Sequence, residues 1–409
     1  MFFYIFISTI LGLPVIIYVL FRFSGKERRE RLGFFKFHIR KTIWIHAASV
    51  GEVNAVKPLI LRLLEENIPM DLVLSTMTST GREAARKVSD RIEVVYFPID
   101  LQLIMVRAFR MISPGMIILV ETELWPVFLT EAARKKVPVL IVNGRISDKS
   151  FPGYRRFLFF WKPLFRTIAA VCAQSAEDAG RFRELGFKQV ENCRNLKFSV
   201  TLPEYDQITV KKETGFTEDD FLLVWGSSRP GEEKLLREVF AGLKKKISNL
   251  KAILVPRHLS RLSEILQIYQ GCNFRLYSEP VKQVDILIVD QMGQLTKFYA
   301  IADITIIGGS FFGHGGHNPL EPAYYGKPII MGKDHDSCRL SVNKLLENSG
   351  IIITEVRYLE SAISELSTDS DKRTAMGSNA KKTLENEAGS LEVTLTMIRD
   401  FLISLERED

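Results

Sequence analysis

Short apolar runs alternate with amphipathic stretches along most of the chain after residue 42. The amphipathic stretches have helical spacing, and they predict helices over Gly51–Glu66, Gly81–Asp90, Pro126–Lys136 and Ser175–Leu185. The apolar runs between them have the length of buried strands: Ile43–His46, Leu72–Ser75, Val94–Tyr96, Met116–Val120, Val137–Asn143 and Ala169–Ala173. Strands that alternate with helices predict a parallel sheet with right-handed crossovers.

A second series of the same kind follows the polar stretch Ser199–Asp219. Its predicted helices include Gly231–Lys246 and Leu259–Gln270, and its predicted strands are Phe221–Trp225, Ala252–Val255, Phe274–Leu276, Ile286–Val289, Ile304–Ile307 and Ile329–Met331. We therefore expect an α/β protein with two Rossmann-like domains facing a cleft, over residues 43–200 and 201–409. The polar tail Ser367–Asp409 has a helical pattern and is placed with the second domain.

The first 21 residues carry no charge and are long enough to cross a bilayer core. Residues 22–42 form a basic juxtamembrane collar, in which Arg22–Lys41 hold eight basic and two acidic residues for a net charge of +6. A cleaved signal peptide would place positive charge before the apolar run, whereas here it follows. We predict a transmembrane anchor at 1–21, a body on the cytoplasmic side of the membrane, and attraction of the collar to anionic lipid. The alternative is a buried N-terminal core helix.

The composition is that of a globular protein, with 46% hydrophobic and 25% charged residues. Four scattered cysteines favour a reducing compartment over a disulfide framework. His314 and His317 are neighbours in a loop but lack the helical spacing of a zinc motif, so we predict no metal site. Nucleic acid is not an expected partner, because the basic collar adjoins the predicted anchor and no binding motif accompanies it.

Several unusual loops follow the predicted strands, at the edge where open α/β sheets bind ligands. In HAASVGEV, Glu52 opens a helix, where it is a candidate general base or simply complements the helix N-terminus. In STMTSTGR, Arg82 and the helix N-terminus could hold a phosphate. ETELWP places Glu121 directly after a strand, and NLKF places Lys197 near the junction of the two domains.

The second half contributes three further strand-end segments: GSSRPGEE, Pro256-Arg257-His258, and the Gly-rich stretch of residues 308–332. Arg257 suits a phosphate leaving group. The glycines allow close backbone approach to a ligand, and the carboxylate of Glu321 suits a diol. A plain Gly-rich connection is the alternative for this loop, which contains no P-loop motif. Each segment alone fits capping or ion pairing, but their shared position at strand ends favours a site.

The segments ASVGEV, ETELWP, NLKF, PRH and GGHNPLEP, in this order, closely resemble the Kdo transferases of lipopolysaccharide synthesis (glycosyltransferase family 30). The resemblance covers nearly the whole chain to about residue 332. It implies a GT-B fold and metal-independent, inverting transfer of Kdo from CMP-Kdo to a lipid A precursor, without a cofactor. Glu52 matches the general base, and Glu121 and Lys197 match residues that stabilise the transition state. The donor would be held by Pro256, Arg257, Met292, Gly293, Gln294, Asn318, Pro319, Leu320 and Glu321.

Three positions depart from the family pattern: GSSR where GSTH is common, Gln294 where Glu is common, and Cys193-Arg194 where a Gly precedes Asn195. The role of Arg229 in GSSR stays open. Phe151–Arg166 interleaves aromatic with basic residues and is either a membrane-facing or acceptor-facing surface or an ordinary amphipathic helix. Two other functions stay open: a membrane-anchored GT-B glycosyltransferase that uses a UDP-sugar, and a non-catalytic scaffold or nucleotide sensor.

Overall fold

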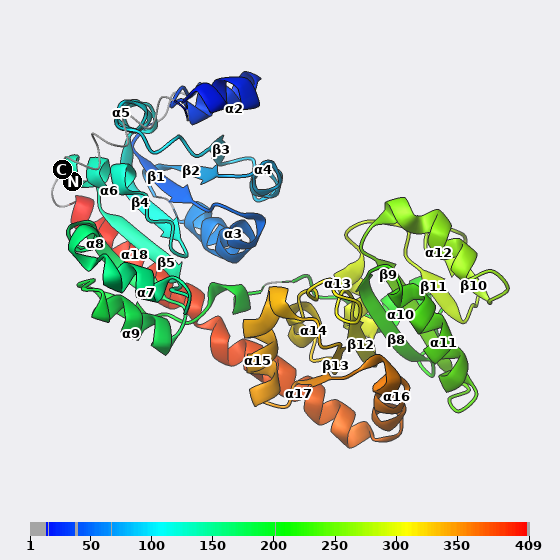
Figure 1. Ribbon diagram of the computed structural model, residues 1–409. Coiled ribbons are helices and arrows are strands. Elements are labelled where there is room, and N and C mark those ends of the chain that lie inside the picture. The colour runs from blue at the N-terminus through cyan, green and yellow to red at the C-terminus, as the bar shows by residue number, and fades with distance from the viewer. Residues whose placement is uncertain (1–13, 15, 37–39, 67, 201, 407–409) are drawn as a thin grey trace. The chain divides into compact units, whose positions relative to one another are not determined.

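The computed structural model describes residues 14, 16–36, 40–66, 68–200 and 202–406 (Figure 1). The chain divides into two compact units. The first comprises Met1–Ser199 together with Glu387–Asp409, and the second comprises Val200–Asn386. Each unit is built around one seven-stranded parallel sheet, so the predicted pair of parallel α/β domains is confirmed.

The first sheet has the strand order β3-β2-β1-β4-β5-β6-β7, with every pairing parallel. Its strands are β1 (Thr42–His46), β2 (Asp71–Thr76), β3 (Glu93–Tyr96), β4 (Pro114–Val120), β5 (Val139–Gly144), β6 (Ile168–Ala173) and β7 (Val190–Asn192). Its helices are α2 (Gly25–Arg31), α3 (Val50–Glu65), α4 (Ser79–Arg86), α5 (Gln102–Ile112), α6 (Pro126–Arg134), α7 (Phe151–Arg156), α8 (Leu158–Phe165), α9 (Ala176–Glu184), the 3-10 turn η1 (Leu196–Phe198) and α18 (Ser390–Glu406).

Both faces of this sheet are covered, which explains why its strands are apolar at successive positions rather than at alternate ones. Along β1, Ile43 and Ile45 pack into the hydrophobic cluster under α3, whereas Trp44 packs into the cluster on the opposite face. All three side chains are fully buried. Because all the strands are parallel, the chain leaves each of them at the same edge of the sheet. The loops at this edge can carry polar side chains.

The second sheet has the order β10-β11-β9-β8-β12-β13-β14, again with parallel pairings throughout. Its strands are β8 (Phe221–Ser228), β9 (Leu250–Pro256), β10 (Phe274–Leu276), β11 (Ile286–Ile288), β12 (Ile304–Ile307), β13 (Ile329–Met331) and β14 (Ile351–Ile353). Its helices are α10 (Gln207–Thr214), α11 (Glu232–Lys244), α12 (Leu262–Ile268), α13 (Leu295–Ile301), α14 (Leu320–Tyr324), α15 (Arg339–Glu347), α16 (Leu359–Thr368) and α17 (Ser370–Ala388). The polar stretch expected to join the domains thus contains helix α10.

The C-terminal tail differs from the sequence-based expectation, which placed all of it in the second domain. Helix α18, red in Figure 1, belongs to the first unit, where it contacts α3 and η1. Its apolar face, including Leu395 and Ile398, is buried in the cluster under α3, and Met397 contacts the thiol of Cys172 at 3.4 Å. A polar tail with one apolar stripe needs a partner surface, but the stripe does not show which domain supplies that surface.

Among the described residues, no helix combines the length and apolar character needed to cross a membrane. Most of the anchor predicted at residues 1–21, namely residues 1–13 and 15, lies outside the described residues. Part of the predicted collar is packed into the fold, because α2 contacts β3 and Arg31 donates to the carbonyl oxygen of Met77 at 2.7 Å.

Candidate active site

Glu52 lies in the first turn of α3, directly after β1, and its carboxylate is held by two short hydrogen bonds. The backbone N–H of Ala48 donates to Oε2 at 2.7 Å, and the hydroxyl of Ser49 donates to Oε1 at 2.8 Å. Ser49 is also the N-cap, and its Oγ accepts from the N–H of Glu52 at 3.4 Å. This reciprocal Ser-x-x-Glu arrangement resembles a capping box and fixes the side chain in one position.

Burial is the main cause that raises the pKa of Glu52 to about 7, and the neighbouring carboxylates of Glu121 and Glu123 raise it further. The hydrogen bonds from Ser49 and Ala48 oppose the rise but do not cancel it. A carboxylate that loses its proton only when the pH reaches about 7 is a stronger base than an ordinary glutamate. The position predicted for a general base therefore has the electrostatics of one.

The loop after β4 brings Glu121 to the same edge of the sheet. Glu121 adopts a left-handed backbone conformation with φ of 61°, which turns the chain sharply at the end of the strand. Its Oε1 accepts a hydrogen bond from Nζ of Lys197 at 3.3 Å. Lys197 lies in η1, whose N-cap Asn195 accepts from the backbone N–H of Lys197 at 2.9 Å. The two residues predicted to stabilise the transition state therefore form one ion pair.

Glu123 and His46 lie next to this ion pair, and neither was given a role from the sequence. Burial raises the pKa of Glu123, as does the charge of Glu121, while the indole N–H of Trp125 donates to its Oε2 at 3.1 Å. His46 ends β1 and stacks on Phe97 with ring centroids 4.0 Å apart. Its Nε2 lies 4.0 Å from Oε2 of Glu123 and has no hydrogen-bond partner among the described residues. Burial lowers the pKa of His46 to about 3, so this ring is neutral.

Arg82 does not take part in this group, contrary to the expected phosphate contact. Its guanidinium is buried, donates to Oε1 of Glu30 at 3.0 Å and to the carbonyl oxygen of Val94 at 3.3 Å, and lies over the ring of Tyr96. Glu30 comes from α2, within the predicted collar. The charge of Arg82 is thus already paired inside the fold, and it attaches α2 to the sheet.

In the second unit, the fully buried carboxylate of Glu232 joins two loops at the carboxyl edge of the sheet. It accepts hydrogen bonds from four backbone N–H groups, one in the turn after β8 and three in the Gly-rich loop after β12. The donors are Arg229 and Gly309, each 2.9 Å from Oε2, and Ser310 and Phe311, 3.1 and 3.3 Å from Oε1. Burial raises the pKa of Glu232, and these four donors oppose that rise. Glu232 therefore sets the shape of the loop that the sequence singled out.

Arg257 follows β9 at the same edge and is exposed. Burial raises the pKa of Glu321 in α14 to about 7, and the charge of Arg257 opposes this rise. The predicted cation for a phosphate and the predicted carboxylate for a diol are therefore electrostatic neighbours.

The other residues predicted to hold the donor flank the same edge. Met292 and Gly293 are exposed in the loop before α13, and Gln294 caps that helix without a side-chain hydrogen bond. Helix α13 contacts α14. Asn318 is exposed, and its Oδ1 accepts from the N–H of Leu320 at 3.1 Å, which starts α14. Pro256, Pro319 and Leu320 are buried.

Arg229 lies within the same group, between two histidines. Its Nε donates to Nε2 of His317 at 3.3 Å, and its Nη1 is 2.7 Å from Nε2 of His258. Burial lowers the pKa of His317 to about 4, and Arg257 and Arg229 lower it as well. The described residues contain no group of three or more His, Cys, Asp or Glu side chains arranged to hold a metal ion.

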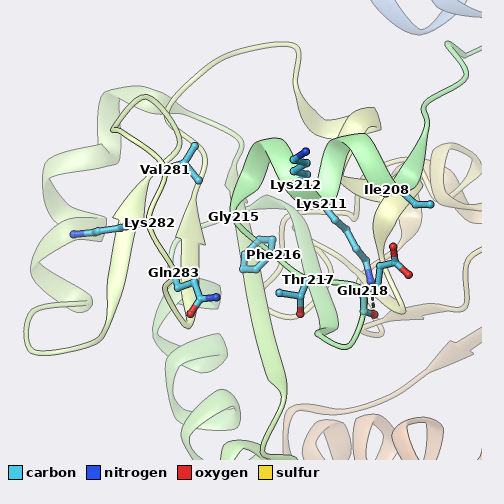
Figure 2. A pocket seen from close by; sticks show the side chains of 10 residues that line it. All are labelled: Ile208, Lys211, Lys212, Gly215, Phe216, Thr217, Glu218, Val281, Lys282 and Gln283. Carbon is cyan, nitrogen blue, oxygen red and sulfur yellow. Dashed lines mark hydrogen bonds between the residues drawn. The ribbon is translucent and has the colours of Figure 1, made fainter.

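A pocket of about 480 Å³ in the second unit lies away from these residues (Figure 2). Its lining comes from α10 and the segments that precede β8 and β11, including Lys211, Phe216 and Val281. It therefore lies toward the amino ends of the parallel strands, opposite the edge that carries Arg257 and Glu321. Lys211 Nζ is held there by the carbonyl oxygens of Glu218 and Asp220. None of the predicted site residues lines this pocket.

The residues missed from the sequence are those whose partners are distant in the chain. Glu232 meets its loop 77 to 79 positions later, and Arg229 meets His317 88 positions later. The Ser49-x-x-Glu52 spacing is a local signal that could have indicated the held carboxylate. No local signal distinguishes the buried ring of His46 from an ordinary strand residue.

Residues 26–200 match the family described as 3-deoxy-D-manno-octulosonic-acid transferase (kdotransferase), and residues 211–383 match glycosyl transferases group 1. A 3-deoxy-D-manno-octulosonic acid transferase of Rickettsia felis is 31% identical over 394 residues, covering 93% of this chain and 83% of the relative. A bifunctional glycosyltransferase/methyltransferase of Fusobacterium nucleatum is 39% identical over 305 residues, which is 71% of this chain but 47% of that relative's length.

Solved structures show the same fold at low sequence identity. UDP-GlcNAc 2-epimerase from Neisseria meningitidis, bound to UDP-GlcNAc, is 11% identical to this chain, with a TM-score of 0.58. The match covers 88% of this chain and 100% of that chain. The two parallel-sheet units are therefore GT-B-like.

Proposed function

Because this chain belongs to the 3-deoxy-D-manno-octulosonic acid (Kdo) transferase family, we propose that it transfers Kdo from CMP-Kdo to a lipid A precursor in lipopolysaccharide synthesis. The main observation that supports the mechanism is the carboxylate of Glu52, which is fixed by two hydrogen bonds and has its pKa raised to about 7. A sugar hydroxyl is a weak nucleophile and needs a base as it attacks.

In the proposed reaction, a hydroxyl oxygen of the acceptor attacks the anomeric carbon of Kdo and forms the new C–O bond. Its proton passes to the carboxylate of Glu52. The bond between the anomeric carbon and the phosphate oxygen breaks, and CMP leaves with the electron pair. A single displacement of this kind inverts the anomeric configuration, as the family resemblance implies.

The remaining charged residues stabilise the charge that develops during this displacement. Arg257 receives the phosphate of the leaving CMP, and Glu321 accepts hydroxyl groups of its ribose. Lys197, paired with Glu121 at 3.3 Å, supplies a positioned cation in the first unit. Preorganised cations of this kind usually provide the largest part of such catalysis. We propose that no metal or organic cofactor is required, which full activity in EDTA would support.

We also propose that the protein acts at the cytoplasmic face of the inner membrane, where its lipid acceptor would be. The uncharged residues 1–21 would anchor it, and the exposed cations of the collar would contact anionic lipid. In the segment Phe151–Arg166, Phe157 is 49% and Phe159 is 80% exposed, and basic residues flank them. Flotation with vesicles of anionic phospholipid tests this surface, because replacing both aromatics with serine should weaken the binding.

A UDP-sugar donor is the alternative, because the solved structures that share the fold include UDP-sugar enzymes. The two donors are separated by incubating the protein with CMP-Kdo and a tetraacylated lipid A precursor and weighing the product by mass spectrometry. A mass increase of one or more Kdo residues supports the proposal. Protection against heat by UDP but not by CMP, without any such product, would refute it. Failure to bind either nucleotide would favour a non-catalytic scaffold.

A further inference from the structure

Three loops at the carboxyl edge of the second sheet bring two arginines and two histidines together. Arg229 follows β8, Arg257 and His258 follow β9, and His317 comes from the loop after β12. These strands are neighbours in the order β9-β8-β12. Contacts between residues up to 88 positions apart therefore build one basic cluster.

The side chain of Arg229 is held by neutral acceptors rather than by a carboxylate. A guanidinium group can only donate, so Nε2 of His317 and Nε2 of His258 both accept from it, at 3.3 and 2.7 Å. Within the described part of the chain, no carboxylate lies within ion-pair distance of Arg229 or Arg257. Two neighbouring guanidinium groups that form no ion pair can accept an anion, because charge-assisted hydrogen bonds to arginine are strong.

Gly309 permits this packing. Its backbone has φ of 72°, and a Cβ at this position would lie 3.1 Å from Cδ2 of His317 and 3.6 Å from Cγ of Arg229. The buried carboxylate of Glu232 holds the backbone N–H groups of both Gly309 and Arg229. Protein groups of the second unit therefore position the arginine and the loop around it.

We propose that Arg229, supported by His258 and His317, binds the carboxylate of the donor sugar, beside a phosphate position at Arg257. This inference rests on the proposed function. In a CMP-activated ulosonic acid, the carboxylate and the phosphate oxygen are attached to the same anomeric carbon, so the two anions must bind side by side. The structure supplies two neighbouring arginines, because Arg229 contacts His317 at 3.3 Å and also contacts His258, the residue after Arg257, at 2.7 Å. A UDP-hexose has no carboxylate on that carbon, so Arg229 would select against it.

The test compares CMP, which lacks the sugar carboxylate, with CMP-Kdo, which has it, by equilibrium binding in the absence of acceptor. Arg229→Gln should weaken CMP-Kdo binding roughly 10- to 100-fold, because one charge-assisted contact is lost, and change CMP binding by less than about threefold. Arg257→Gln should weaken both ligands. Lys234→Gln is the control, since this exposed lysine of α11 has only a 3.9 Å contact to Glu238. It should change neither.

Equal losses of CMP and CMP-Kdo in Arg229→Gln would assign Arg229 to the phosphate and overturn the inference, as would no loss of either. Thermal unfolding shows whether each variant is folded. Arg229→Lys is a second variant that keeps the charge without the planar fork, and it should give an intermediate loss confined to CMP-Kdo. If the unchanged protein does not bind CMP, the proposed function fails first. If CMP binds but Arg229 does not discriminate the carboxylate, only this inference fails.

Discussion

Replacing Glu52 with glutamine should stabilise the protein at alkaline pH while removing most of its transfer activity. Glutamine has the same shape, and its amide satisfies the existing partners: Oε1 accepts from the N–H of Ala48, and the NH₂ group donates to the hydroxyl of Ser49. The variant therefore loses the charge without leaving a buried polar group unpaired.

The expected gain follows from the pKa of the wild-type side chain. Glu52 has a pKa of about 7 in the folded protein and an ordinary value of 4.5 when unfolded, so folding disfavours its charged form. The wild-type protein therefore carries no penalty below about pH 4.5 and loses stability as the pH rises through about 7. The penalty reaches about 3 kcal/mol at pH 8 and is about 1 kcal/mol at pH 5. Glu52→Gln removes it.

Calorimetric unfolding of both proteins at pH 8 and pH 5 measures this difference. The variant should unfold at a higher temperature at pH 8, and the advantage should shrink toward pH 5. Glu65→Gln, on the exposed side of the same helix, should change stability by no more than about 0.5 kcal/mol at either pH. Transfer by Glu52→Gln should fall roughly 10²- to 10⁴-fold. A variant no more stable than wild type at pH 8, or one that retains activity, refutes the reasoning.

Three further substitutions separate structural from catalytic roles. Glu232→Gln offers the four N–H groups only one good acceptor oxygen. The free energy of unfolding of the second unit, measured by denaturant titration, should therefore fall by about 2–4 kcal/mol, and the KM for the donor should rise. An unchanged titration midpoint would contradict this. Arg82→Met leaves the buried carboxylate of Glu30 with only the exposed Lys26, 3.7 Å away, as a cationic partner, and should lower the free energy of unfolding by about 3 kcal/mol. The kcat of the folded fraction should not change, and a reduced kcat would show that Arg82 takes part in the reaction. Lys197→Met should lower kcat roughly 10- to 10³-fold while the KM for the donor stays nearly constant. A change in KM as large as the change in kcat would contradict the role of Lys197 in the transition state.

Most strands of both sheets could be predicted from the sequence, because parallel strands are buried on both faces and are therefore apolar throughout. All twelve predicted strands occur in the structure. Two more edge strands, β7 (Val190–Asn192) and β14 (Ile351–Ile353), were missed, and β7 contains only one apolar residue. Helix α18 was placed in the wrong domain, because its apolar stripe indicates burial but not the partner.

The site could be predicted as far as local motifs extend. Glu52, Glu121 and Lys197 follow strands, and parallel strands bring their loops to one edge. The pairing of Arg82 with Glu30 spans 52 positions and depends on how α2 packs, so an arginine that looked free for phosphate is part of the core. Glu232 looked like a residue of a Gly-rich turn, although its carboxylate organises a loop of the same unit 77 to 79 positions later.

Each unit holds one carboxylate that titrates near neutral pH, and the two should affect different kinetic constants of transfer. In the first unit, burial and the neighbouring carboxylates place the pKa of Glu52 near 7, so its charge changes between pH 6 and pH 8. In the second unit, burial and neighbouring arginines hold the pKa of His317 near 4, so the positive charge there resides on arginines, which do not titrate in this range. Glu321 does titrate there, because burial raises its pKa to about 7. With saturating donor, transfer should therefore rise with pH up to a half-maximum near 7 as Glu52 loses its proton. The KM for the donor should fall over the same range, because ionised Glu321 is a stronger acceptor for the ribose hydroxyls. A donor KM that rises with pH over this range would contradict the role of Glu321 in donor binding, and a kcat that does not change with pH would contradict the role of Glu52 as the base.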